Sequence, residues 1–138
     1  MLEFVGEVMS RGVVVVASET SALEVARLMR DEGVADVLIE ADGLLWGIAS
    51  EHDMTVRLLA AGLDPASTPV ALVADSIVHT VAPEQEIHDV LQLMRAHGLW
   101  RLPVTDHGDI VGIVTLGDLA LHDSRRLQPS PQAAEAPT

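Results

Sequence analysis

The strongest constraint on this chain is that it contains one sequence pattern twice, at a constant offset and without a gap. The matched pairs include Val16 and Val81, Val25 and Val90, Met29 and Met94, Gly33 and Gly98, Gly43 and Gly108, Gly47 and Gly112, and Asp53 and Asp118. Internal repetition of this kind indicates two copies of one structural unit. The sequence predicts copies at residues 5–61 and 70–123, a linker at 62–69 and a disordered tail at 124–138.

The first half of each copy predicts a strand followed by a helix. β-Branched and apolar runs at residues 13–16 and 77–81 are typical of buried strands. Apolar residues then recur at helical spacing, as Ala22, Val25, Ala26 and Met29 and as Ile87, Val90, Leu91 and Met94. Ser21 and Glu24 have the spacing of a helix-capping pair, and Gly33 and Gly98 suit the left-handed residue that ends a helix.

The second half of each copy predicts a hairpin and another helix. Asp42-Gly43 and His107-Gly108 separate short apolar runs, which is the signature of a tight β-hairpin. A second helix is expected from Ser50 and from Thr115. Each copy is therefore an α+β unit of order β-α-β-β-α. Because one unit of about 50 residues buries little apolar surface, we expect the two to pack sheet to sheet about a pseudo-twofold axis.

Composition excludes several classes of protein. The 138 residues carry 8 basic and 21 acidic side chains, a net charge of −13, so nucleic acid and anionic membranes are disfavoured as partners. The chain has no cysteine, which excludes disulfides, thiolate catalysis and cysteine-based zinc sites. Without a visible signal peptide or a membrane-length apolar run, a cytoplasmic protein is expected.

These features together resemble a CBS domain pair, named after cystathionine β-synthase. The segments that carry the resemblance are Val5-Gly6-Glu7-Val8-Met9-Ser10, Leu102-Pro103-Val104, Gly47-Ile48-Ala49-Ser50-Glu51-His52-Asp53 and Gly112-Ile113-Val114-Thr115-Leu116-Gly117-Asp118. The resemblance covers residues 5–123. It implies a regulatory, non-catalytic module that binds an adenosine-containing ligand such as AMP, ADP, ATP or S-adenosylmethionine in the cleft between its repeats. It also implies a homodimer and a regulated protein partner, with no cofactor required.

The repeated pattern S/T-x-x-D has two interpretations. Ser50 with Asp53, and Thr115 with Asp118, have the spacing of a helix N-cap and an exposed acid in the first turn. A carboxylate at this position can also accept both hydroxyl protons of a ribose, and the helix N-terminus favours phosphate. The resemblance favours the second interpretation, because the family's Asp contacts ribose. Gly117 belongs to the same segment.

One position breaks the match between the copies. Arg101 precedes Leu102-Pro103-Val104, where family members often reach ligand phosphates, whereas its counterpart is Asp36. Both could also be solvated charges at strand ends. The resemblance groups Arg101 with Ser50 and Asp53 as site A, and Asp36 with Thr115 and Asp118 as site B. We therefore expect phosphorylated adenosine at site A and a less negatively charged ligand at site B.

The resemblance implies that the adenine of each site lies against the first strand of the partner repeat. The candidates are His79 with Ile77 and Val78 for site A, and Val14 with Val13 for site B; the alternative is that the valines are simply core residues. Trp100 is expected to be a packing residue, although it lies beside Arg101 near the cleft and is therefore a further candidate.

Other functions have less support in the sequence. The six histidines lack the spacing of known zinc motifs, and no catalytic motif stands out, so neither a metal site nor an enzyme is expected. The main alternative is a ligand-independent interaction or dimerisation module. Its second helices would present Val56, Leu59 and Ala60, and Leu119, Ala120 and Leu121, to another chain.

Overall fold

The computed structural model describes residues 3–77 and 79–127, with side chains through residue 122. The chain divides into two compact units. Unit 1 comprises Met1–Arg11 and His79–Thr138, and unit 2 comprises Gly12–Val78. The unit boundaries differ from the repeat boundaries, because the segment that opens the first copy belongs to unit 1.

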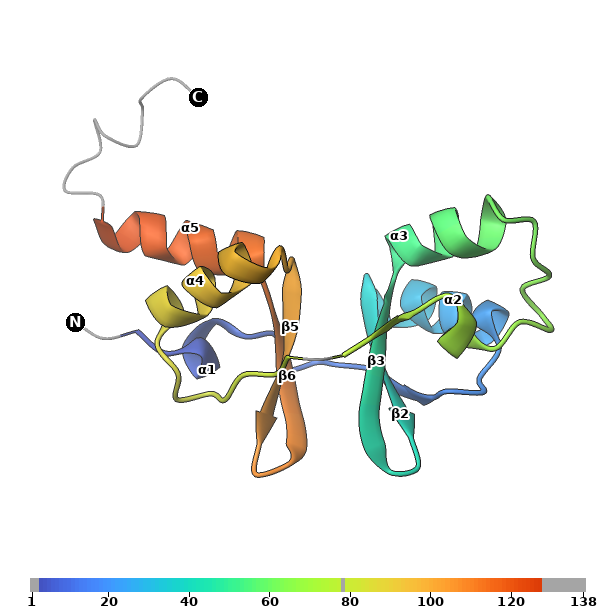
Figure 1. The fold of residues 1–138 in the computed structure, drawn as a ribbon, viewed down its shortest axis with the longest axis horizontal. Coiled ribbons are helices and arrows are strands. Elements are labelled where there is room, and N and C mark those ends of the chain that lie inside the picture. Colours follow the sequence, from blue (N-terminus) through green and yellow to red (C-terminus); the bar gives the residue numbers. More distant parts are fainter. Residues whose placement is uncertain (1–2, 78, 128–138) are drawn as a thin grey trace, which may run out of the picture. The chain divides into compact units, whose positions relative to one another are not determined.

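Unit 2 is a four-stranded sheet with helices on one face (Figure 1). Its strands are β1 (Val15–Ala17), β2 (Asp36–Ala41), β3 (Leu44–Ser50) and β4 (Asp75–Ser76), in that spatial order. β1 pairs with β2 in parallel, and β2–β3 and β3–β4 are antiparallel. The helices are α2 (Ala22–Glu32), α3 (Glu51–Asp53), the π-helix η1 (Met54–Leu59) and the 3-10 turn η2 (Val70–Leu72).

Unit 1 repeats this plan with a shorter sheet. β5 (Arg101–Asp106) and β6 (Asp109–Thr115) form an antiparallel hairpin, and α1 (Val5–Val8), α4 (Ile87–His97) and α5 (Leu116–Leu127) lie on one side of it (Figure 1). Single bridges replace the outer strands. Val81 pairs in parallel with Val104, and Ser10 pairs antiparallel with Ile113. The β-α-β-β-α order is therefore recognisable in both units, and the α+β class is confirmed.

Local signals in the sequence predict the turns and helix ends correctly. Gly33 and Gly98 end α2 and α4 with left-handed φ values of 68° and 64°. Asp42 and His107, the first residues of the two hairpin turns, have positive φ, as do the glycines that follow them, as a type I′ turn requires. The Ser21 hydroxyl accepts a hydrogen bond from the Glu24 amide at 3.2 Å, as its spacing predicts.

Several predicted boundaries are wrong. The first strand runs from Val15 to Ala17 instead of 13–16, and of the strand predicted at 77–81 only Val81 forms a bridge; Val78 lies outside the described residues. The α5 backbone continues to Leu127, into the segment 124–138 predicted as a disordered tail; residues 128–138 are not described. The packing of the two sheets against each other stays a prediction.

The π-helix is the largest departure from local expectation. A helix through Leu59 is predicted, but Ala60 donates its amide to the Thr55 carbonyl at 2.9 Å, an i→i−5 bond. The Thr55 hydroxyl also donates to the Glu51 carbonyl at 3.1 Å. A side chain that bonds the carbonyl four residues earlier competes with the regular helical ladder, which favours the wider turn. π-Helical turns occur often at functional sites.

Each unit has its own aliphatic core. Val25, Met29, Val37 and Ile39 are central in unit 2, and Val90, Leu91, Met94 and Leu119 in unit 1. The burial of Leu119 corrects one prediction. Leu119 is fully buried, not part of a surface for another chain, because its face of α5 packs on the unit 1 core; Leu121 is exposed. Within the described residues, no helix is long and apolar enough to cross a membrane.

Candidate functional site

The first S/T-x-x-D segment, at the start of α3, forms a complete capping box. The Asp53 amide donates to the Ser50 hydroxyl at 3.1 Å, and the Ser50 amide donates to Asp53 Oδ2 at 2.8 Å. Asp53 is 5% exposed, so the prediction of an exposed acid at this position is wrong. Both reciprocal hydrogen bonds of the box are present, so the helix-capping interpretation is confirmed for Ser50 and Asp53.

The second segment, at the start of α5, is more open. The Asp118 amide donates to the Thr115 hydroxyl at 3.1 Å, so Thr115 also caps its helix. Asp118 and Gly117 are exposed, and a Cβ atom added at Gly117 would meet nothing within 4 Å. The two acids therefore differ in their surroundings, although they hold the same position in the repeat.

The two residues that differ in charge lie beside these caps. In unit 2 the strand register pairs Asp36 with Ser50, and in unit 1 it pairs Arg101 with Thr115. Both Asp36 and Arg101 are half-buried. Strand pairing thus brings each charge to the start of its own unit's second helix. The assignment of Arg101 to site A and of Asp36 to site B stays a prediction.

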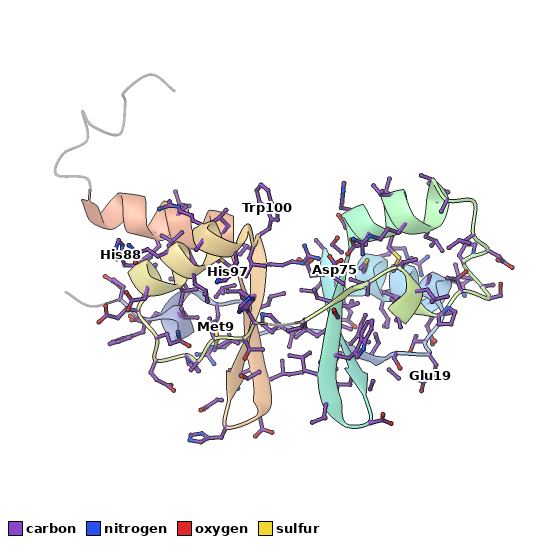
Figure 2. All side chains as sticks on the ribbon, viewed as in Figure 1. Met9, Glu19, Asp75, His88, His97 and Trp100 are labelled. Carbon is purple, nitrogen blue, oxygen red and sulfur yellow. The ribbon has the colours of Figure 1, made fainter. Side chains whose placement is uncertain are left out.

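A cation that the sequence analysis missed lies next to Asp53. Arg57 Nη1 lies 2.7 Å from Asp75 Oδ1, and Arg57 Nε lies 4.0 Å from Asp53 Oδ1. The hydrogen bond to Asp75 is the largest influence on Arg57, and it raises the pKa of the guanidinium above its usual value. The Asp75 side chain is labelled in Figure 2, where the partner of Arg57 can be located. The helical spacing of Asp53 and Arg57 was a usable signal, whereas the approach of Asp75 depends on the pairing of β4 with β3.

The residues predicted to contact adenine differ in their burial and in their contacts. Val14 is half-buried and packs against the unit 2 core, which agrees with the simpler interpretation of the valines as core. The His79 ring lies 4.6 Å from the His97 ring, between centroids, at an interplanar angle of 39°. Trp100 is 72% exposed, and its side chain projects from the body of unit 1 (Figure 2). Packing therefore does not explain Trp100.

Two cavities in unit 2 are lined by none of the predicted site residues. The one at the carboxyl end of β1 has a volume of about 390 Å³ and is lined by Glu19, Glu40 and Asp42. This acidic lining opposes an anionic ligand. The second cavity, of about 500 Å³, lies along α2 beside Ala66. Neither contributes to the site predicted from the sequence.

The placement of the His, Asp and Glu side chains was compared with what a metal site would need. Among the side chains that the structure describes, in residues 3–77 and 79–122, no group of three or more His, Asp or Glu is placed to hold an ion. The absence of a metal from the protein's function remains a prediction.

Comparison with known proteins settles the family. The family model for the CBS domain matches residues 5–60 and 70–124, which agree with the two predicted copies to within one residue. The chain belongs to the CBS domain family. Tandem CBS modules are generally regulatory and interact with ligands or with proteins, and stand-alone CBS-domain proteins are generally non-catalytic.

Three members of this family are similar to the chain in sequence or in structure. The CBS domain-containing protein YhcV of Bacillus subtilis is 34% identical over 118 residues, which cover 86% of this chain and 84% of YhcV. Hypoxic Response Protein I, whose crystal structure contains two coordinated zinc ions, is 30% identical in sequence to this chain. The two structures match with a TM-score of 0.72, over 87% of this chain and 98% of that one. The hexameric CBS-CP12 protein from bloom-forming cyanobacteria is 22% identical and has a TM-score of 0.82, covering 98% and 80%.

Proposed function

We propose that this CBS pair is a regulatory module that binds an adenosine-containing ligand of the AMP, ADP or ATP class and passes its state to a protein partner. The observation that carries the proposal is the repeated S/T-x-x-D cap with a charged residue beside each copy. Asp53 and Asp118 supply carboxylates for ribose, and His79, Trp100 and Val14 supply surfaces for adenine. Neither a cofactor nor catalysis is part of the proposal, and the cytoplasmic location stays a prediction.

The choice among ligands follows from charge. Arg101 and Asp36 give the two predicted sites opposite electrostatic environments. A carboxylate about 5 Å from a phosphate, at an effective dielectric constant of about 20, costs on the order of 3 kcal/mol, or about two decades in affinity. The proposal therefore assigns the phosphorylated ligand to site A and adenosine or S-adenosylmethionine to site B.

The first test replaces Asp118 with asparagine, because this acid is exposed and its loss perturbs folding little. Charge-assisted hydrogen bonds contribute about 1.5–3 kcal/mol each. We expect calorimetry to show adenosine binding at site B weakened at least about tenfold. The control is Asp109→Asn, which removes another exposed carboxylate of unit 1 and is expected to bind as the parent does. Unchanged binding by the Asp118 variant would leave Asp118 as a helix-capping acid alone.

A second variant in the same calorimetric series separates phosphate from nucleoside. Arg101→Gln is expected to weaken AMP binding much more than adenosine binding, because only AMP carries the charge that the guanidinium attracts. A preliminary thermal-shift panel of AMP, ADP, ATP, NAD, S-adenosylmethionine and a cyclic dinucleotide identifies the best ligand for the series. A ligand at 100 times its dissociation constant adds about 2.7 kcal/mol to stability.

A ligand-independent dimerisation module is the second candidate. Leu59 and Val56 on η1 are 75% and 49% exposed, and Leu121 on α5 is 54% exposed. Apolar residues exposed on successive helical turns favour contact with another chain. We expect light scattering to give a homodimer at micromolar concentration, and Leu59→Arg to yield monomer. A parent protein that is monomeric at that concentration would contradict this second function.

A further inference from the structure

Arg57 occupies a position between two carboxylates of different character. Asp53 is buried and committed to the capping box through Oδ2, and its Oδ1 lies 4.0 Å from Arg57 Nε. Asp75 lies on β4, and its side chain is 52% exposed where it accepts a hydrogen bond from Arg57 Nη1 at 2.7 Å. The guanidinium side chain is itself 45% exposed. It thus reaches from the buried cap to solvent.

We infer that Arg57 is a specificity-determining residue, supplying the cation that a phosphorylated ligand requires at the Asp53 site, and that Asp75 competes with phosphate for it. The inference rests on the proposed function. A guanidinium binds phosphate through two parallel hydrogen bonds, as it binds a carboxylate. An exposed ion pair stabilises a protein only weakly, so a phosphate can displace Asp75 from Arg57 at little cost.

The charge of unit 2 makes this cation important. Residues 12–77 contain three arginines and eleven acidic residues. Of the other two arginines, Arg30 hydrogen-bonds Asp31 on α2, and Arg27 lines the cavity along the same helix. Without Arg57 the described charges of unit 2 around Asp53 would be acidic.

The second copy lacks this arrangement. His122 holds the position in the second copy that Arg57 holds in the first, and its Nε2 lies 3.1 Å from Glu3 Oε2. Ser10 and Asp75 are likewise equivalent by the repeat offset, and they pair with the equivalent isoleucines of the central strands, Ile113 and Ile48 respectively. The permanently charged guanidinium and its competing acid therefore belong to one copy only. This difference adds to the asymmetry that Arg101 and Asp36 create.

The experiment measures AMP and adenosine affinities of the full chain by calorimetry. Arg57→Gln is expected to weaken AMP binding about tenfold or more and to change adenosine binding less than twofold. Asp75→Asn is expected to tighten AMP binding about threefold or more and to leave adenosine binding unchanged. The matched controls are Arg30→Gln and Asp31→Asn, because this exposed pair has the same 2.7 Å separation and the same charges. Neither control is expected to alter either affinity.

The possible contrary results have distinct meanings. Equal weakening of AMP and adenosine by Arg57→Gln would show that Arg57 only positions Asp53, which overturns the inference. AMP binding unchanged by Asp75→Asn, or changed equally by Asp31→Asn, would overturn the competition by Asp75. If the parent protein binds none of AMP, ADP, ATP and adenosine at millimolar concentration, the proposed function fails, and the inference fails with it. Thermal unfolding of each variant checks that it remains folded.

Discussion

Replacing Leu119 by alanine is expected to lower the free energy of unfolding by about 3 kcal/mol. Leu119 is fully buried on α5, where it packs in the same core as Leu91 and Met94. Removing a buried leucine side chain loses its transfer free energy and leaves a cavity, at a cost of about 2–5 kcal/mol. Chemical denaturation with urea measures the change.

The matched control for this prediction is Leu121→Ala. Leu121 lies two residues further along the same helix but is 54% exposed, so its loss is expected to change unfolding by less than about 1 kcal/mol. If both variants unfold alike, or if Leu119→Ala alters only the oligomeric mass, the packing of α5 on unit 1 differs from that described.

Replacing Gly47 by alanine is expected to lower the free energy of unfolding by about 2 kcal/mol, within the range of about 1–3 kcal/mol that overpacking costs. A Cβ atom at this position would lie 2.7 Å from the backbone oxygen of Asp75, because β4 pairs closely with β3 there. Backbone atoms cannot rotate aside as a long side chain can. The same variant is expected to reduce the effect of Asp75→Asn on AMP binding, since it displaces the strand that carries Asp75.

The control is Gly117→Ala. Gly117 lies within α5, and a Cβ atom there would meet nothing within 4 Å. Alanine restricts the unfolded chain and favours the helix, so a gain of about 0.5 kcal/mol is expected. Denaturation midpoints compare the two variants. A Gly47→Ala protein as stable as the parent would show that β4 can move away from β3 without cost.

The candidate site was predictable in its parts but not in its assembly. Ser50 with Asp53, and Thr115 with Asp118, have capping spacing that is visible in the sequence, and both pairs do cap helices. Spacing does not reveal that Asp53 is buried whereas Asp118 is exposed, because burial depends on neighbours distant in the chain. The contact of Arg57 with Asp75 was not visible for the same reason, since Asp75 lies 18 residues away on another strand.

The duplication and its local geometry follow from the amino-acid sequence alone. The constant offset between the copies is visible in the residues alone, and the Asp42-Gly43 turn and the left-handed Gly33 each depend on a few adjacent residues with restricted φ and ψ. The unit that each connecting segment joins depends instead on contacts between residues distant in the chain. The segment containing α1 belongs to unit 1, and β4 completes the sheet of unit 2, because strand pairing and core packing reward contacts between distant segments, which local conformational preferences do not specify.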